Sequence, residues 1–278
     1  MRTILINYKG GQVETHIKSE WNELTWSDLR FVIEHFFGNL DRIYVKNDNP
    51  EEGGKLVVND KRLLRSVIAG ITLKLWDIKP NVFKEIPGSE LDKLIDMYFP
   101  IKFLMEGNGF TKCPVKRVFH WGWYQAPGDD FTTVDFEEFC YADAQYYKFR
   151  KTRKIEDLDM FAAILLRKAP KQKVEGIEKR GVFNPQLVEK RLPMARSLSY
   201  ERKLALWLWW EGCRQKQAKI YKDFFKKGDD SGNSGGSLFN VMLSMSKDIF
   251  GPLEQTKRVN CKLAFARMDQ LIKQSNED

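Results

Sequence analysis

The stretch LALWLWW, Leu204–Trp210, is an unbroken apolar run of seven residues, and no apolar run in this chain of 278 residues is longer. Seven residues cannot cross a bilayer as a helix, because a crossing needs about 20 apolar residues. The run lies inside a longer segment, Tyr200–Lys227, for which we predict a helix. On a helix, Trp207, Trp209 and Trp210 spread over more than half of the circumference. Either this helix is buried on most sides, or one of the tryptophans contacts a partner.

The segments around this run are also predicted to be helical. Apolar residues recur at helical spacing in residues 132–151, 155–168 and 253–274, each bounded by capping or helix-breaking residues. A polar, basic connector lies near residues 168–183, and the glycine- and serine-rich residues near 228–236 are typical of a flexible loop. We therefore expect a mainly α-helical domain over residues 86–278.

The first 85 residues have a different pattern. Alternating residues on both sides of Gly10-Gly11 predict a β-hairpin. In the stretch EWNELTWSDL, residues 20–29, Thr25 and Asp28 have the spacing of a capping box at the start of a helix. Short strands are expected near residues 41–48 and 55–60, a helix over 61–70 and a strand over 71–78. The chain is thus predicted to be α+β, with a small β-containing region over residues 1–85 before the helical domain.

The composition bounds the function only loosely. A hydrophobic content of 42% is typical of a folded chain, and the net charge of +8 favours an acidic partner. The four cysteines form no C-x-x-C pair, and the N-terminal residues lack the apolar run of a signal peptide. We therefore expect reduced thiols and an intracellular location.

Sequence patterns of catalysis are missing from the chain. Its three histidines form no HExxH pattern, and neither a GxSxG elbow nor a GxxxxGK[ST] phosphate loop occurs. The acidic residues near 129–138 lack the spacing of an EF-hand. We accordingly predict no catalytic residue, no metal site, no cofactor and no enzyme activity.

A basic stretch is one candidate for binding. Between Lys148 and Arg191 the chain has thirteen Lys and Arg against six Asp and Glu. Such a surplus can neutralise phosphates, although a solvated connector has the same composition. Candidate nucleic-acid contacts are Arg150, Lys151, Arg153, Lys154, Arg167, Lys168, Lys171 and Lys173.

Aromatic residues are the other candidate. A segment expected to be a loop, residues 107–130, contains the cluster FHWGWYQAPGDDF. Aromatic side chains are enriched at protein interfaces and also in cores, and the sequence leaves both roles open. Candidate partner-binding residues are Trp121, Trp123 and Tyr124 in this loop and Trp207, Trp209 and Trp210 in the predicted helix.

The order of several segments resembles a known group of proteins. The hairpin is followed by S-x-W-N-E-L-T-W at Ser19–Trp26, then by FEEFCYADAQYYKF at Phe136–Phe149 and LDMFAAILLRK at Leu158–Lys168, and SLFNVMLSMSKDIFG comes after the glycine-rich loop. This order resembles proteins encoded in the tail-gene region of phages and prophages of Bacteroidetes-type bacteria, described as tail-assembly or tail-chaperone-like proteins.

The resemblance implies a non-enzymatic role in phage tail assembly, in which the protein binds another tail component. It also implies a location in the cytoplasm of the host cell, with the virion as a second location. Two alternatives remain open. In the first alternative, the protein is retained in the particle as a minor structural subunit. In the second, it is an accessory factor that contacts nucleic acid through residues 148–191. The resemblance assigns no functional residue, no partner by name and no oligomeric state.

Overall fold

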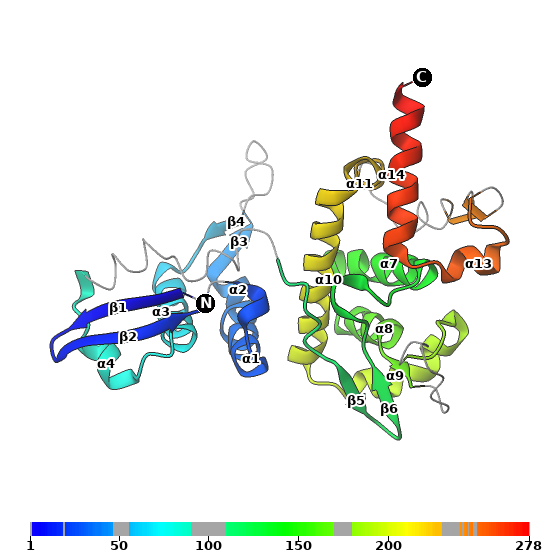
Figure 1. Cartoon of the computed structure of the whole chain (residues 1–278). Helices are drawn as coiled ribbons and strands as arrows, with labels where there is room; N and C mark the ends of the chain where they lie inside the picture. Colours follow the sequence, from blue (N-terminus) through cyan, green and yellow to red (C-terminus); the bar gives the residue numbers. More distant parts are fainter. Residues whose placement is uncertain are drawn as a thin grey trace. The chain divides into compact units, whose positions relative to one another are not determined.

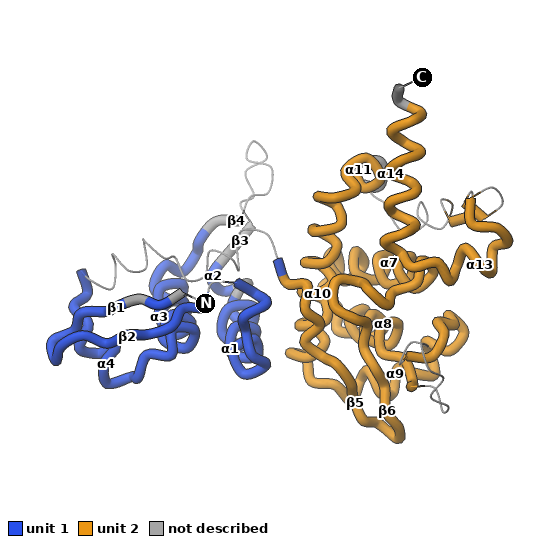
Figure 2. Tube along the Cα trace, viewed as in Figure 1, with its two compact units in different colours: residues 1–109 blue, residues 110–278 orange. Residues whose placement is uncertain are grey.

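The chain has an α+β fold that is mainly helical, as the computed structural model shows (Figure 1). The structure describes residues 2–18, 20–46, 56–89, 109–169, 180–229, 240, 242–243, 245–246 and 249–277. These residues divide into two compact units, 1–109 and 110–278 (Figure 2). The division falls between Gly109 and Phe110, whereas the sequence pattern placed it near residue 85.

Unit 1 combines a hairpin with short helices. Its elements are β1 Arg2–Tyr8, β2 Gly11–Ile17, α1 Trp26–His35, α2 Leu40–Ile43, β3 Tyr44–Lys46, β4 Leu56–Val58, α3 Lys61–Leu75 and α4 Pro80–Glu85. Strands β1 and β2 pair antiparallel, with Tyr8 opposite Gly11, so the predicted hairpin and its turn are confirmed. Strands β3 and β4 form a second antiparallel pair. The hairpin and helices α1 and α3 enclose one apolar core that includes Ile6, Ile17, Val32, Ile71 and Trp76.

The predicted capping box at the start of α1 is present. The Asp28 backbone N–H donates to the Thr25 hydroxyl, and the Thr25 N–H donates to the Asp28 carboxylate at 2.9 Å. Lys18, at the end of the hairpin, lies 2.6 Å from the same carboxylate. Burial alone would raise the pKa of Asp28, but the hydrogen bonds from Lys18 and Thr25 hold it below its usual value. The motif therefore joins the hairpin to the helix.

The strand predicted over residues 71–78 is wrong. Helix α3 continues through this segment to Leu75, and Trp76 is its C-cap. The side chains of Val67, Ile71 and Leu75 are all buried, and their spacing of four residues places them on one face of the helix. The apolar residues of this segment therefore belong to the buried face of a helix and not to a strand.

Unit 2 is a group of helices with one small sheet. Its elements are β5 Arg117–Phe119, β6 Trp123–Gln125, α7 Phe136–Thr152, α8 Ile155–Leu165, β7 Arg167–Lys168, α9 Val188–Arg196, α10 Tyr200–Ile220, α11 Lys222–Asp229, α13 Leu253–Arg258 and α14 Cys261–Glu277. Helix α8 packs against α7, α9 and α10, and α14 packs against α7 and α11. The long helix predicted from Tyr200 is broken at Tyr221, between α10 and α11. Residues 170–179 of the predicted connector and 230–236 of the predicted loop lie outside the described residues.

Helix α10 is surrounded by other elements at its apolar run. Trp209 and Trp210 are fully buried, and Trp207 is only 5% exposed. The Trp210 ring stacks on Phe139 of α7 at 5.3 Å between ring centroids, and its edge meets Phe161 of α8 at 5.7 Å. Of the two alternatives left by the sequence, burial on most sides is the observed one. The expectation that Trp207, Trp209 and Trp210 bind a partner is therefore wrong for the folded unit.

The buried indole groups also keep hydrogen-bond partners. Trp209 Nε1 donates to the Thr111 carbonyl at 2.9 Å, and Trp210 Nε1 donates to the Asp143 carboxylate at 3.3 Å. A buried indole N–H without an acceptor would be costly, so these bonds fix which way each ring faces. The bond to Thr111 ties α10 to the segment that leads into β5.

The capping box gives a stability prediction. Replacing Thr25 by Ala removes one acceptor for the helix and should lower the free energy of unfolding by about 1 kcal/mol. Ser27→Ala, on the exposed side of the same helical turn, is the matched control and should change it by less than about 0.5 kcal/mol. Urea unfolding of the two variants measures the difference. Equal effects of the two substitutions would contradict this role of Thr25.

Candidate interaction site

The aromatic segment predicted to be a loop forms a β-hairpin instead. Strands β5 and β6 pair antiparallel, with Phe119 opposite Trp123, and β6 also pairs with β7. Within β5, Val118 is buried, whereas Arg117 and Phe119 on either side of it are exposed. The alternation therefore exists, but three residues are too few for it to be recognised in the sequence. The glycine between the two aromatic runs was the only local signal of a turn.

The turn of this hairpin presents a tryptophan to solvent. Trp121 is 90% exposed and has a φ of 50°, a conformation that costs a residue with a side chain roughly 1 kcal/mol. Gly122 follows with a φ of 137°, and a Cβ at this position would lie 3.1 Å from Lys168. A backbone strain that presents a large aromatic side chain to water is typical of a functional position.

The side chains next to the turn extend the aromatic surface. Phe119 is 66% exposed and Trp123 is 48% exposed, with their ring centroids 5.2 Å apart. The Arg117 guanidinium lies 4.7 Å from the centre of the Trp123 ring, and Lys168 Nζ lies 6.0 Å from the Tyr124 ring. Of the loop residues predicted to bind a partner, Trp121 and Trp123 are thus on the surface, and Tyr124 is half-buried below them.

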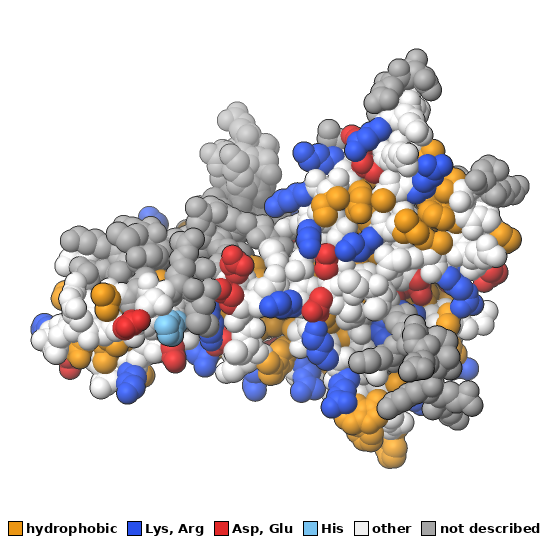
Figure 3. Space-filling view, viewed as in Figure 1, with side chains coloured by type: hydrophobic (Ala, Val, Ile, Leu, Met, Phe, Trp, Pro, Cys, Tyr) orange, Lys and Arg blue, Asp and Glu red, His pale blue; other side chains and the backbone are white. Residues whose placement is uncertain are grey.

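The hairpin carries positive charge only. Residues 107–128 include Lys112, Lys116 and Arg117 but no Asp or Glu. Lys116 is paired with Asp129 at 2.5 Å. Among the residues that the structure describes, Arg117 and Lys168 lie over aromatic rings of the hairpin and form no ion pair. In Figure 3 hydrophobic side chains gather at the β5–β6 end of unit 2, with Lys and Arg beside them. We call Arg117, Phe119, Trp121, Trp123 and Lys168 the aromatic tip.

A buried ionic cluster attaches the small sheet to the helices. Glu138 of α7 is fully buried and accepts from Arg167 Nη2 at 2.8 Å and from Arg180 Nη2 at 2.7 Å. Arg180 Nη1 also donates to the Leu165 carbonyl at 3.1 Å. Because Arg167 belongs to β7, its bond to Glu138 fixes the sheet to α7. His120 and Ser197, whose side chains lie 3.2 Å apart, connect the turn to the end of α9.

This cluster corrects one predicted nucleic-acid contact. Arg167 is only 1% exposed, and its charge is neutralised inside the unit, so it cannot reach a phosphate. The others predicted with it that the structure describes are exposed, namely Arg150, Lys151, Arg153 and Lys154 near the end of α7 and Lys168 in β7. Lys171 and Lys173 lie outside the described residues. The sequence shows that these residues are charged. It does not show that Arg167 is buried in an ion pair with Glu138, which is distant along the chain.

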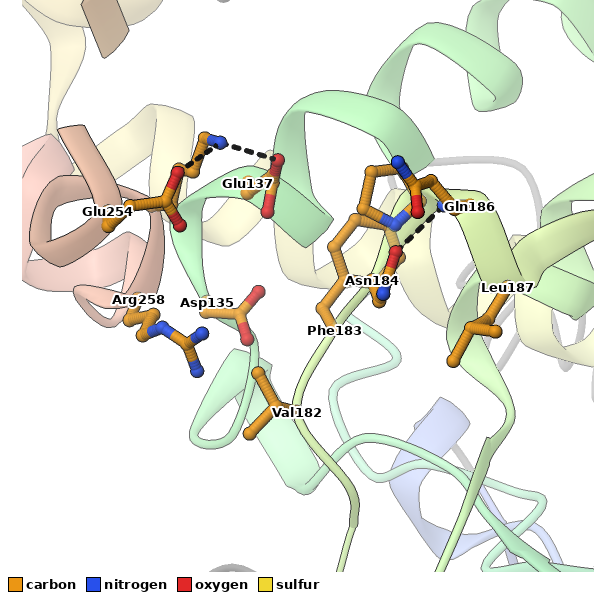
Figure 4. A pocket seen from close by; sticks show the side chains of 11 residues that line it. Asp135, Glu137, Val182, Phe183, Asn184, Gln186, Leu187, Glu254 and Arg258 are labelled. Atoms are coloured by element: carbon orange, nitrogen blue, oxygen red, sulfur yellow. Dashed lines mark hydrogen bonds and ion pairs between the residues drawn. The ribbon is translucent and has the colours of Figure 1, made fainter.

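A pocket of about 470 Å³ lies next to the same cluster (Figure 4). It is lined by Asp135, the N-cap of α7, by Glu137 of α7, by residues 182–187, and by Glu254, Lys257 and Arg258 of α13. Lys257 lies 2.8 Å from Glu254 and 3.7 Å from Glu137, so these charges neutralise one another. Figure 4 shows the Arg258 guanidinium extending toward Asp135. The lining residues include no His, Cys or Ser, so the pocket has no hydroxyl or thiol nucleophile paired with a histidine base.

The four cysteine thiols, which are potential nucleophiles, are all buried. Burial raises the pKa of the Cys113 thiol to about 12, and it also raises the pKa values of Cys140, Cys213 and Cys261. At neutral pH these thiols are protonated and poorly nucleophilic. Within the described residues, no group of three or more His, Cys, Asp or Glu is placed to hold a metal ion. No helix in the described part of the chain is long and apolar enough to cross a membrane.

In comparisons with known proteins, no family model matched the chain, and no curated protein or solved structure was significantly similar to it. The function must therefore be inferred from the residues and contacts of the chain itself.

The ionic cluster gives a prediction for the pH dependence of stability. Burial, together with the charge of Glu138, raises the pKa of Asp135 from 3.8 to about 6. Between these values the folded state holds a proton that the unfolded state has lost, so the contribution of Asp135 to stability falls as the pH rises through this window. Asp135→Asn keeps a good N-cap residue for α7 and removes this slope.

The free energy of unfolding of Asp135→Asn, relative to the wild type, should therefore rise between about pH 4 and pH 7. The upper limit of the rise is about 3 kcal/mol. Urea unfolding at several pH values measures it. Asp60→Asn, at the exposed N-cap of α3, controls for the chemical change itself. A constant difference between Asp135→Asn and the wild type across this range would contradict the assignment.

Proposed function

We propose that this protein is a non-enzymatic binding protein and that the aromatic tip of unit 2 is its docking element. The proposal is carried by the contrast among the tryptophans of unit 2. Trp207, Trp209 and Trp210 are buried, whereas Trp121 is 90% exposed on a strained turn. The unit thus buries three large aromatic rings and leaves Trp121 in water, at a cost in backbone strain that packing within the unit does not explain.

The energy available from such a surface fits a protein interface. Burying an exposed tryptophan removes roughly 200 Å² from water, worth about 5 kcal/mol before the costs of association. Residues of this kind dominate binding energy at interfaces, in particular where aromatic and arginine side chains lie together. Phe119 and Trp123 enlarge the same surface, and the Arg117 guanidinium covers the Trp123 ring.

For the biological role we propose phage tail assembly, which follows from the resemblance of the segment order. In this role the protein binds another tail component in the host-cell cytoplasm and shields its apolar surface until assembly. Retention in the particle as a minor structural subunit is the alternative. The two roles differ in whether the protein is present in finished virions.

A second candidate function is contact with nucleic acid. The observation that favours it is the group of four exposed cations where α7 ends, Arg150, Lys151, Arg153 and Lys154. These residues are separate from the buried Arg167, and they follow one another closely in the chain. Lys148 of the same helix is paired with Asp157 at 2.9 Å, so acidic residues compete for part of this charge.

The docking role predicts a specific loss of binding. Tagged protein from a host that produces the whole tail should co-purify with one other tail protein at a fixed ratio, and Trp121→Ala should lower the recovered partner at least about tenfold. Leu263→Ala, which removes an exposed apolar side chain of α14, is the matched control and should leave recovery unchanged. Mass spectrometry quantifies the partner, and thermal unfolding checks that both variants fold.

Two results would change this account. Equal recovery with Trp121→Ala and the wild type would exclude the aromatic tip as the docking element. Detection of the protein at constant stoichiometry in purified particles would replace the assembly role by the structural one.

The nucleic-acid role makes a separate prediction. If it holds, a labelled oligonucleotide binds at low salt, and binding falls steeply as salt rises because counterions are released from the phosphates. Lys151→Gln with Lys154→Gln should weaken it. Lys219→Gln with Lys222→Gln, at the end of α10 and the start of α11, serves as a control of equal charge change. No mobility shift at low salt would exclude this role.

A further inference from the structure

Strand β5 has a free edge next to the aromatic tip. The three-stranded sheet has the order β5-β6-β7, so β5 pairs on one side only. The Ala126 N–H donates to the Lys116 carbonyl and the His120 N–H donates to the Gly122 carbonyl, which makes the even-numbered residues of β5 the ones bonded to β6. By antiparallel alternation, the N–H and C=O groups of Arg117 and Phe119 point away from β6. In the described part of the chain, neither residue has a backbone hydrogen bond on that side.

An unpaired edge of this kind is a template for another strand. Proteins usually protect such edges with charged residues and short strands, and Arg117 with the three-residue length of β5 fits that pattern. Phe119 and Trp121 do not fit it, because they place exposed aromatic side chains along and beyond the same edge. The edge is therefore not shielded from partners, because exposed aromatic side chains that can contact a partner lie beside it.

The charge around this edge selects the partner. Residues 107–128 include no acidic side chain, the Arg117 guanidinium lies over the Trp123 ring, and Lys168 Nζ lies over the Tyr124 ring. An incoming chain with acidic side chains would find complementary charge at Arg117, whereas a basic chain would be repelled there.

We propose that an extended, acidic segment of the partner protein adds as a strand to the free edge of β5. This inference rests on the proposed docking function and specifies its mode. The backbone of the segment hydrogen bonds with Arg117 and Phe119, its acidic side chains lie near Arg117, and its apolar side chains contact Phe119 and Trp121. Strand addition of this kind gains affinity from main-chain bonds and specificity from alternate side chains.

The free backbone groups favour a peptide over a nucleic acid at this site. Single-stranded nucleic acids also bind exposed aromatic rings and cations. A β-strand edge, however, offers alternating donors and acceptors at the spacing of another polypeptide backbone. Only a peptide uses the aromatic rings, the cations and the edge together.

The test begins with a random peptide library displayed against the full-length protein. The enriched peptides should alternate acidic with apolar residues and should lose binding at least about tenfold to Trp121→Ala. Arg117→Pro removes the outward N–H, and an edge strand tolerates a proline at such a position. Arg117→Ala removes the same charge but keeps the N–H. Arg117→Pro should therefore bind the peptides about tenfold more weakly than Arg117→Ala does.

Hydrogen exchange of the wild-type protein provides a readout that needs no variant. With a selected peptide bound, the amide hydrogens of Arg117 and Phe119 should exchange at least about tenfold more slowly, while that of Val118, already bonded to β6, should change little. Unchanged exchange at Arg117 and Phe119 with peptide bound would overturn strand addition.

The remaining outcomes distinguish a failure of strand addition at β5 from a failure of the docking function of the aromatic tip. If selected peptides lose binding to Trp121→Ala but bind Arg117→Pro and Arg117→Ala equally, strand addition is wrong and the docking role of the tip stands. If no enriched peptide depends on Trp121, both fail. A labelled single-stranded oligonucleotide is titrated in the same assay, and its tighter, Trp121-dependent binding would replace the peptide as the occupant.

Discussion

Unit 2 depends on one constraint, which is that the apolar run of α10 cannot be covered by a single neighbour. Tryptophans spread around more than half of a helix need packing partners on several sides. Phe139 of α7 and Phe161 of α8 meet Trp210, and the Thr111 carbonyl accepts the Trp209 N–H. The chain before β5 and the helices after it are thereby placed around one helix. This arrangement leaves Phe119, Trp121 and Trp123 of the β5–β6 hairpin at the surface of the unit.

The charge of Glu138 adds a second constraint on the same unit. A fully buried carboxylate is stable only with compensating partners, and here Arg167 and Arg180 supply them. Because Arg167 lies in β7, compensation of this charge also fixes the sheet from which the aromatic tip extends. The tip thus extends from a supported sheet, and the turn at Trp121 is connected to the end of α9 through the contact of His120 with Ser197. Rigid presentation lowers the entropic cost of binding.

The sequence predicted those features that depend on neighbours along the chain. The hairpin at Gly10-Gly11, the Thr25 capping box and the helix around Phe136–Phe149 follow from local periodicity and capping. Features that depend on distant residues were missed. The three-residue strands β5 and β6 are too short to show alternation, so the site was predicted as a loop. The burial of Arg167 depends on Glu138. Burial of α10 on most sides was one of two alternatives that the sequence left open, because periodicity does not place the helices that cover it.

The central claim is that unit 2 buries its α10 tryptophans and displays Trp121 for docking. Tryptophan oxidation of the native protein, mapped residue by residue with mass spectrometry, tests this claim most directly. The account predicts rapid modification of Trp121, with Trp209 and Trp210 protected until the protein is denatured. Modification of Trp209 or Trp210 in the native protein as fast as that of Trp121 would contradict it.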